Sequence, residues 1–216
     1  MTLCELATKH GSDKGPKHHN YTPTYSYYFS HYKDLPITLL EVGIGGYHYP
    51  DRGGNSLRMW RDYFTQAKII GIDCYPKSFI IDEVSMFTMN QTDPALAQFS
   101  PDIIIDDASH INPLTIQTFK ILFPALKNGG IYVIEDLETS YWTEHGYEGN
   151  KNPNEGDTAM NFLKSLTDQL NSHIFESKYH NEFSGQIEWI HFYPQIVFIK
   201  KKWYANHVKN ARQLRK

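Results

Sequence analysis

The stretch Leu39-Leu40-Glu41-Val42-Gly43-Ile44-Gly45-Gly46 decides the fold class of this chain. It begins as a short run of β-forming residues that contains one carboxylate, and it ends in a glycine-rich turn. Glycine lets the backbone turn sharply and approach a ligand closely. The glycines do not follow the GxGxxG spacing of dinucleotide-binding turns. The stretch therefore predicts a strand and then a ligand-binding turn of another kind, although a tight turn without a ligand would look similar.

Four more apolar runs follow this one, each ending at small or acidic residues, and helical patterns lie between them. The runs are 68–72, 86–89, 102–105 and 131–134, and the helical patterns are 55–64 and 114–126. Continuous apolar runs, unlike alternating ones, indicate strands that are buried on both faces. Alternation of strands and helices implies parallel βαβ units.

The C-terminal third has a different pattern. A helical stretch at 158–171 precedes two β-rich runs, 186–192 and 195–201, which flank Tyr193-Pro194. Two such runs around a short turn predict an antiparallel hairpin. We therefore predict an α/β fold, a Rossmann-like doubly wound sheet that is mainly parallel and ends in an antiparallel hairpin. The first 36 residues are rich in His, Tyr, Gly and Pro and predict irregular structure with one short helix near 25–32.

The size and composition are those of a single globular domain. Of 216 residues, 40% are hydrophobic and 21% are charged, which excludes the signature of disorder. We expect one domain over 1–216, with residues 1–36 as an N-terminal lid or substrate segment. We expect residues 200–216 to form a basic tail, either a solvated helix or a subunit contact.

The charges are distributed unevenly. The formal net charge is −3, but the last 17 residues hold seven Lys or Arg and no acidic residue, so the rest of the chain carries −10. A body this acidic argues against nucleic-acid binding and points to an acidic site within it. No signal peptide and no apolar run long enough to span a bilayer is found. The two cysteines, Cys4 and Cys74, predict free thiols, and we expect a cytoplasmic protein.

Acidic residues follow three of the predicted strands, where doubly wound sheets bind their ligands. Asp73 follows the second strand and suits either the two hydroxyls of a ribose or a turn cap. The pairs Asp106-Asp107 and Glu135-Asp136 follow two later strands. Four carboxylates close together repel one another unless a cation or raised pKa values relieve them. Oxygen ligands favour Mg²⁺, Mn²⁺ or Ca²⁺, although strand-end caps and surface charges are the alternative.

His110 stands out among eleven histidines because it lies three residues after Asp107. An imidazole held beside carboxylates can take a proton near neutral pH. The cluster His10, His18 and His19 is interpreted as a polar loop rather than a metal site. Aromatic residues lie in segments expected around the pocket mouth, where they would stack on a sugar ring or simply pack together: Tyr21, Tyr47, Tyr141 and Trp142.

Several segments together resemble the metal-dependent sugar O-methyltransferases of macrolide and tetracenomycin-type biosynthesis, and the order of elements resembles class I methyltransferases. The matching segments are Gly11-Ser-Asp-Lys-Gly15, Asn20-Tyr-Thr-Pro23, Leu39 to Tyr47, Arg52-Gly-Gly-Asn-Ser-Leu-Arg-Met-Trp60, Asp106-Asp-Ala-Ser-His110, Tyr132-Val-Ile-Glu-Asp136 and Thr139-Ser-Tyr-Trp142. Each motif alone is weak, but the combination is specific.

The resemblance implies S-adenosylmethionine and Mg²⁺ as cofactors and assigns roles by position. Asp107, Glu135 and Asp136 match the metal ligands, and His110 matches the general base. The positions that match the cofactor pocket are Glu41, Gly43, Gly45, Ser56, Asp73, Gln91 and Asp106. Macrolide-modifying members carry a large N-terminal auxiliary domain, for which we expect no room here.

We therefore predict Mg²⁺-dependent methylation of a sugar hydroxyl, whether the sugar is free, nucleotide-linked or part of a glycosylated natural product. The expected partner is a small hydroxyl acceptor, and we expect a homo-oligomer. One alternative keeps the metal but methylates a catechol-like aromatic diol. A nicotinamide-dependent Rossmann oxidoreductase is a second alternative, which the missing GxGxxG and the terminal hairpin disfavour. A non-catalytic binding protein is the third, and the full carboxylate set disfavours it.

Overall fold

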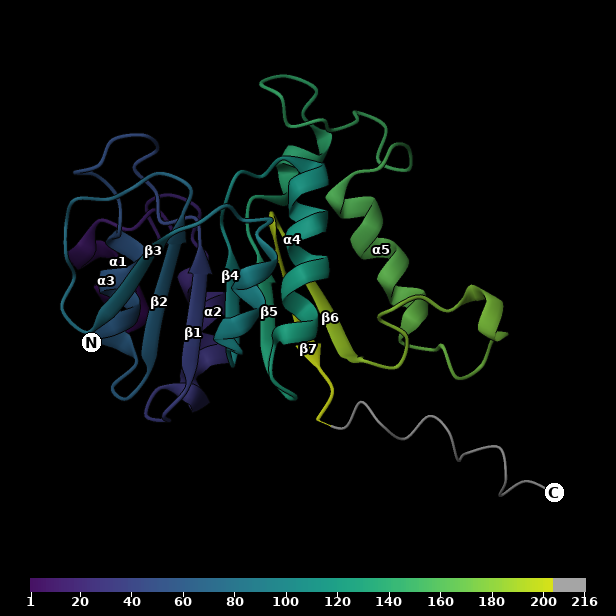
Figure 1. Ribbon diagram of the computed structural model, residues 1–216, viewed down its shortest axis with the longest axis horizontal. Coiled ribbons are helices and arrows are strands. Elements are labelled where there is room, and N and C mark those ends of the chain that lie inside the picture. The colour runs from purple at the N-terminus through teal and green to yellow at the C-terminus, as the bar shows by residue number, and fades with distance from the viewer. Residues whose placement is uncertain (204–216) are drawn as a thin grey trace.

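The computed structural model describes residues 1–203 and contains one seven-stranded sheet (Figure 1). The strand order is β3-β2-β1-β4-β5-β7-β6. The parallel strands are β1 (Thr38–Val42), β2 (Lys68–Asp73), β3 (Val84–Thr88), β4 (Ile103–Asp106) and β5 (Ile131–Ile134). The antiparallel pair is β7 (Ile196–Lys201), beside β5, and β6 (Ile187–Tyr193) at the edge. The predicted mixed sheet with its C-terminal hairpin is confirmed.

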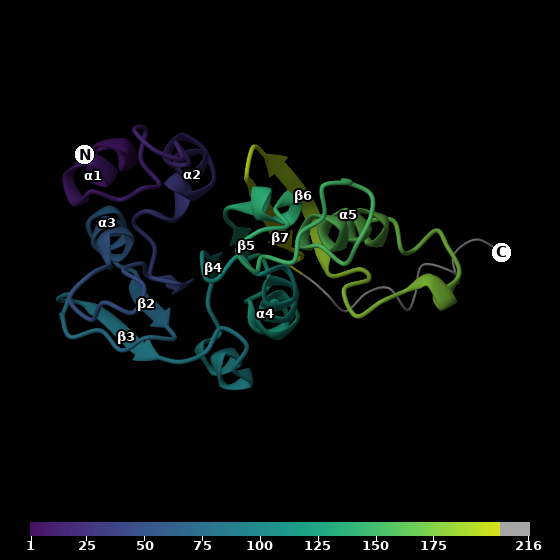
Figure 2. The same cartoon turned by 90° about the horizontal axis from the view of Figure 1, so that it is seen from above.

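Helices cover both faces of the sheet, which explains the continuous apolar runs of the central strands. The prediction of burial on both faces is wrong for the run 86–89, because β3 is an edge strand that is partly exposed. One face carries α1 (Leu3–His10), α2 (Thr22–Phe29) and α3 (Asn55–Tyr63), and the other carries α4 (Asn112–Ala125) and α5 (Ala159–Gln169) (Figure 2). Successive residues of a strand point to opposite faces. Ile103 and Ile105 therefore join one hydrophobic core, and Ile104 joins the other. All three are completely buried.

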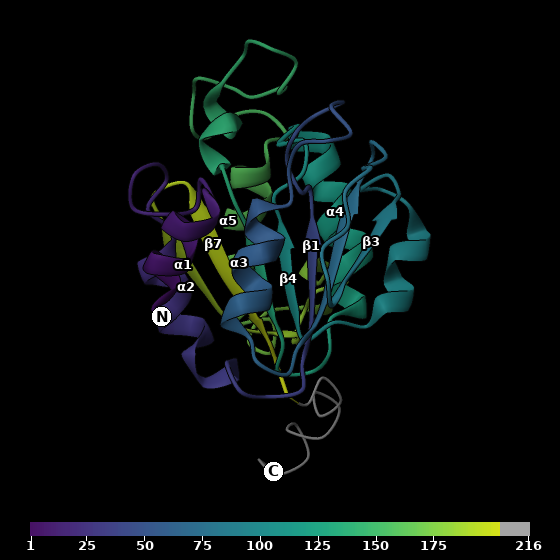
Figure 3. The same ribbon diagram turned by 90° about the vertical axis from the view of Figure 1, so that its left-hand side faces the viewer.

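The expectation of a largely irregular N-terminal segment is wrong, because it holds two α-helices and a short 3-10 helix, Ser30–Tyr32. Helix α1 begins at a capping box, in which Thr2 and Glu5 bond to each other's backbone amides, and it ends at Gly11 in a left-handed conformation. Leu3 and Leu6 are buried in the core below. Figure 3 shows α1 and α2 packed beside α3 and β7, so this segment is an integral layer of the fold.

The first residues of the predicted basic tail belong to the sheet. Lys200 and Lys201 are the last residues of β7, and residues 204–216 of the tail lie outside the described part of the chain. The Lys201 ammonium is buried and donates to three carbonyl oxygens at the end of α4, those of Phe123, Pro124 and Leu126, at 2.7 to 3.0 Å. A cation at a helix C-terminus stabilises the unpaired carbonyls there.

Three more 3-10 helices connect the main elements: Pro94–Phe99, Leu137–Tyr141 and Ser177–Tyr179. Within residues 1–203, no helix is both long and apolar enough to cross a bilayer. Cys4 and Cys74 are free thiols, as predicted.

Candidate active site

The glycine-rich turn after β1 lies where the ends of β1 and β4 almost touch. Gly43 has a φ of 87°, and a Cβ atom there would collide with the backbone of Asp107. Only glycine fits such an approach. Beside this turn lies a cavity of about 190 Å³, whose lining comes from the turn, α3 and the N-terminal segment: Gly11, Asp13, Ile44, Gly45, Gly46, Gly53, Asn55, Ser56 and Asp107. A larger hollow, of about 550 Å³, lies along α4 and contains none of the predicted site residues.

Glu41 and Asp73 both lie next to this turn. The Ser56 hydroxyl donates to Glu41 Oε2 at 2.9 Å, whereas Glu41 Oε1 has no hydrogen-bond partner among the described residues. Burial raises the pKa of Glu41 to about 7. Asp73 accepts from the amides of Tyr75 and Ile44, at 2.8 and 3.4 Å. It therefore caps its own turn and also supports the glycine-rich turn.

Gln91 and Asp106 lie around the end of β4. Gln91 accepts from the Ser109 amide at 3.2 Å and donates to the Thr118 hydroxyl at 3.0 Å. The Tyr132 hydroxyl donates to Asp106 at 3.3 Å, and burial raises the pKa of Asp106 to about 7. Both side chains are more than nine-tenths buried, so they form part of the wall of the site.

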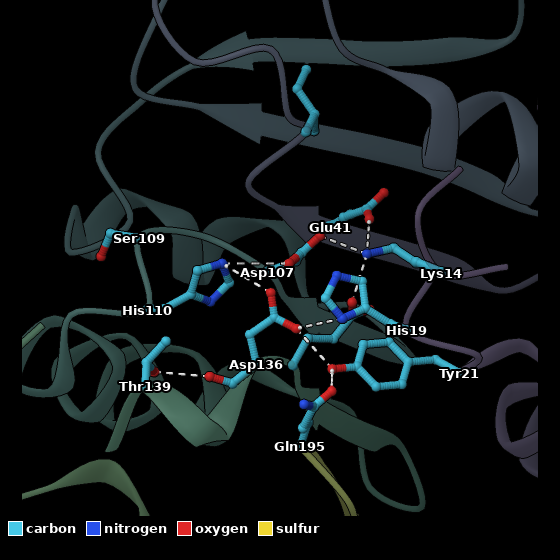
Figure 4. Close-up of polar contacts among 12 residues, drawn as sticks. Lys14, His19, Tyr21, Glu41, Asp107, Ser109, His110, Asp136, Thr139 and Gln195 are labelled. Atoms are coloured by element: carbon cyan, nitrogen blue, oxygen red, sulfur yellow. Dashed lines mark hydrogen bonds and ion pairs between the residues drawn. The ribbon is translucent and has the colours of Figure 1, made fainter. Parts of the chain in front are cut away.

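Asp107, His110 and Asp136 come together from the ends of β4 and β5 (Figure 4). His110 Nε2 lies 3.7 Å from Asp107 Oδ1 and 3.5 Å from Asp136 Oδ2. His110 and Asp136 both have positive backbone φ values, 56° and 53°, which residues other than glycine seldom adopt. Such strain is held in place where the surrounding structure requires it, often at functional sites.

Glu135, the remaining predicted metal ligand, lies next to this group but faces the N-terminal segment. Its Oε2 accepts from Lys14 Nζ at 2.8 Å, and its Oε1 accepts a short hydrogen bond from the Tyr25 hydroxyl. An ionised carboxylate has about four lone-pair positions. Glu135 therefore keeps acceptor capacity, and its role as a metal ligand stays a prediction.

Lys14 is a residue of the candidate site that the sequence analysis did not assign. Its ammonium is 1% exposed and lies 2.5 Å from Asp107 Oδ2 and 3.4 Å from Glu41 Oε1. Burial by itself lowers the pKa of Lys14, but the carboxylates outweigh that effect and raise the pKa well above its usual value. The predicted repulsion among the carboxylates is thus relieved partly by a lysine. Its position within Gly11-Ser-Asp-Lys-Gly15 was the available signal.

The four predicted substrate aromatics have different environments. Tyr21 is 3% exposed, stacks on His19 and donates to Asp136 Oδ1 at 2.7 Å, so in this structure it orients a carboxylate and offers no face to a sugar. Tyr47 and Trp142 are 81% and 43% exposed, and Tyr141 is half-buried. These three stay candidates for substrate contact.

The histidine cluster separates in the structure. His10 pairs with Asp62 at 2.7 Å, away from the strand ends. His19 Nδ1 lies 3.6 Å from Asp136 Oδ1, at the edge of the site. His18 is exposed on the loop between them. The polar-loop interpretation is wrong for His10, which is the last residue of α1, and His19 forms a group with Asp136 and Glu138 whose ligand atoms lie close enough to share a metal ion.

Comparisons with known proteins give a consistent set of relatives, although no family model matches the chain. The chain is 37% identical over 217 residues to the 8-demethyl-8-alpha-L-rhamnosyl tetracenomycin-C 2'-O-methyltransferase of Streptomyces olivaceus, covering 95% of this chain and 56% of that protein. It is 36% identical over 212 residues to the mycinamicin VI 2''-O-methyltransferase of Micromonospora griseorubida, covering 92% and 52%.

A solved structure agrees with these relatives. The MycE methyltransferase from the mycinamycin biosynthetic pathway, in complex with Mg and SAH, superposes with a TM-score of 0.88 at 33% identity, covering 96% of this chain and 56% of that one. The same protein has also been solved with mycinamycin VI, with a TM-score of 0.87. The chain spans about half the length of the curated relatives it matches.

Proposed function

Because this chain is related by sequence and fold to the sugar O-methyltransferases of macrolide and tetracenomycin biosynthesis, we propose that it methylates a sugar hydroxyl with S-adenosylmethionine in a Mg²⁺-dependent reaction. The observation that carries the proposal is the meeting of Asp107, Asp136 and His110 beside the glycine-rich cavity. This group supplies carboxylate oxygens for a cation and an imidazole for a proton.

The residues around the glycine-rich turn suit S-adenosylmethionine. Gly45 leaves open space beside the turn, Gly43 lets the turn pack against the Asp107 backbone, and Asp73 offers a carboxylate at the place where such sheets bind ribose. Glu41 Oε1 is a buried acceptor that makes no hydrogen bond among residues 1–203 and pairs with the Lys14 ammonium only at 3.4 Å. A donor group of the cofactor would give it a closer partner. Ser56, Gln91 and Asp106 complete the proposed pocket.

The acidic group suits Mg²⁺, which prefers oxygen ligands and commonly keeps open positions. Asp107 and Asp136 would hold it, with Glu135 as the third carboxylate. When bound, Mg²⁺ polarises the acceptor hydroxyl and stabilises the negative charge that develops on its oxygen.

In the proposed reaction the acceptor oxygen attacks the sulfonium methyl in line with the departing sulfur. The carbon–oxygen bond forms as the carbon–sulfur bond breaks, and the sulfur leaves as a neutral thioether. His110 Nε2 accepts the hydroxyl proton, a contribution that is typically about 10²–10⁴-fold. Asp107 and Asp136 would stabilise the imidazolium that forms, because both lie within 4 Å of Nε2. Alignment of the two reactants supplies much of the remaining acceleration.

The choice of acceptor distinguishes this proposal from its nearest alternative. A vicinal diol on a sugar and one on an aromatic ring would both reach a bound cation, and the sugar-modifying relatives support the first. The methyltransferase relatives also argue against the nicotinamide enzyme. The binding-protein alternative predicts no turnover at all. We further propose a cytoplasmic location. We also propose that the chain forms a homo-oligomer, which light scattering of the purified chain would test.

The decisive experiment follows transfer of a labelled methyl group from S-adenosylmethionine to a panel of rhamnosides and catechols. We expect transfer to a rhamnoside, loss of transfer in EDTA and recovery with Mg²⁺. His110→Ala should reduce turnover by at least about 100-fold while calorimetry still detects cofactor binding. His18→Ala, an exposed change on the N-terminal loop, is the control. Turnover unaffected by EDTA would remove the metal from the proposal, and normal turnover of His110→Ala would remove the base.

A further inference from the structure

The proposed reaction gives no role to Lys14. Its buried ammonium touches carboxylates from the ends of three strands, Glu41, Asp107 and Glu135, at 3.4, 2.5 and 2.8 Å. A buried charge is unfavourable unless it is closely paired. Here the pairing is threefold, so Lys14 is a fixed cation inside the acidic group.

The two oxygens of Asp107 divide the acidic group into two halves. Oδ2 accepts from Lys14, while Oδ1 lies toward His110 Nε2, and Figure 4 shows Asp107 between these two residues. We call Lys14, Glu41 and Asp107 Oδ2 the inner half. Glu135, the proposed third metal ligand, lies at the boundary, and its Oε2 also accepts from Lys14. The outer half consists of Asp107 Oδ1, Asp136 Oδ2 and His110.

The backbone around Lys14 keeps its side chain in the inner half. The carbonyl oxygen of Lys14 accepts from the amides of Tyr21 and Thr22, at 2.9 and 3.1 Å. The next residue, Gly15, packs so closely that a Cβ atom there would lie 3.0 Å from Ala7 Cβ. The start of α2 and the contact with α1 therefore fix the backbone of Lys14. Moving its side chain out of the inner half would disturb both contacts.

We propose that Lys14 is a positioning residue that acts as a built-in counter-ion: it neutralises the inner half and confines the divalent cation to the outer half, beside His110. This inference rests on the proposed function. The physical reason is that an ammonium within hydrogen-bonding distance of the inner oxygens repels a second cation from them. A divalent ion drawn into the inner half would lie on the far side of Asp107 from the proposed base, where it could not serve the acceptor hydroxyl.

The test compares Lys14→Met, which keeps the length and removes the charge, with Lys14→Arg, which keeps the charge. Lys17→Met, at an exposed position of the same segment, is the matched control. Binding of Mn²⁺ to the full chain is followed by the paramagnetic resonance of the free ion, and kcat and KM for S-adenosylmethionine are measured separately. Circular dichroism establishes that each variant is folded.

We expect Lys14→Met to bind Mn²⁺ about tenfold more tightly, or to bind a second ion, while kcat falls by about tenfold or more. Lys14→Arg keeps the charge and should bind Mn²⁺ with an affinity within about threefold of that of the unmodified chain. Lys17→Met should bind Mn²⁺ as the unmodified chain does. A merely structural role for Lys14 predicts the opposite, unchanged or weaker Mn²⁺ binding together with lower kcat. Unchanged or weaker binding by a folded Lys14→Met would overturn the proposal.

A second pair of variants keeps the proposal testable if Lys14→Met does not fold. Glu41→Gln removes an inner carboxylate and should leave Mn²⁺ affinity within about threefold, whereas Asp136→Asn should weaken it at least about tenfold. Equal weakening by both would place the ion in the inner half and refute the inference. Mn²⁺ binding needs no methyl transfer, so failure of the proposed function would appear separately, as absence of turnover with every acceptor.

Discussion

Asp136 combines an unfavourable backbone conformation with opposite uses of its two oxygens. Its φ of 53° costs about 1–3 kcal/mol in a non-glycine residue. Oδ1 accepts from the Tyr21 hydroxyl at 2.7 Å, and Oδ2 lies 3.5 Å from His110 Nε2. Because one oxygen is held by a buried donor, the carboxylate cannot rotate freely, and the second oxygen stays directed toward the proposed base.

We predict that Tyr21→Phe lowers kcat by about tenfold, because it removes one charge-assisted hydrogen bond that orients Asp136. The phenyl ring keeps the packing, so the melting temperature should change little. Tyr27→Phe, whose ring is 74% exposed on the neighbouring helix α2, is the control. Steady-state kinetics of both variants would show the difference, and equal kcat values for the two would contradict the orienting role.

The predicted site residues that the structure brings together are placed by a general rule, whereas Lys14, which was not predicted, is placed by distant contacts. Asp107 and Asp136 end parallel strands, and such ends meet at one edge of a sheet. The bonds from Lys14 join it to Asp107 and Glu135, which are 93 and 121 residues away. No local pattern predicts such a pairing, because it depends on where α1 and α2 pack against the finished sheet.

At the scale of elements, the buried strands were easy to predict and the first helix was not. The sequence Ile103-Ile-Ile105 permits little except a strand buried on both faces. Helix α1 is only eight residues long, and its best sequence signals are its ends, the capping box of Thr2 and Glu5 and the terminal Gly11. Short helices depend on tertiary contacts for stability, so periodicity alone identifies them poorly.

One such contact joins α1 to α3 and should make stability depend on pH. Lys9 Nζ and His10 Nε2 each lie 2.7 Å from Asp62 Oδ2, and these bonds hold the pKa of Asp62 well below its usual range. A carboxyl whose pKa is lowered in the folded state contributes stability above its unfolded pKa and loses it as the pH falls. The contribution should therefore be complete at neutral pH and decline at acid pH.

We predict that Asp62→Asn lowers the free energy of unfolding by about 1 kcal/mol at pH 7, since these partly exposed pairs are screened by solvent. The difference from the unmodified chain should shrink progressively below about pH 5. Asp168→Asn, at an exposed position of α5, is the control. Urea unfolding at several pH values measures the effect, and a difference that is constant or grows at acid pH would show that the pairs do not act through the Asp62 charge.

At the scale of the whole molecule, the first helices belong to the same core as the sheet. Leu6 is 3% exposed and Phe29 is completely buried, and both lie in the cluster that also contains Trp60 of α3 and Phe198 of β7. A segment that opened and closed as a detachable lid would leave this core largely intact when it moved. Because the segment packs into the core, the donors Lys14 and Tyr21 are held in place relative to the strand ends that carry their carboxylate acceptors.

Leu6→Ala tests this integration, because a residue of a detachable segment would not change global unfolding. We predict that it lowers the free energy of unfolding by about 2–4 kcal/mol, the usual cost of a cavity at a buried leucine. Leu35→Ala, at a position that is 46% exposed between α2 and β1, should cost less than about 0.5 kcal/mol. Urea titration followed by far-ultraviolet circular dichroism gives both values. If Leu6→Ala were as mild as Leu35→Ala, or produced a separate early transition, the N-terminal helices would be an independent unit and the orientation of Asp107 and Asp136 could not depend on a rigid segment.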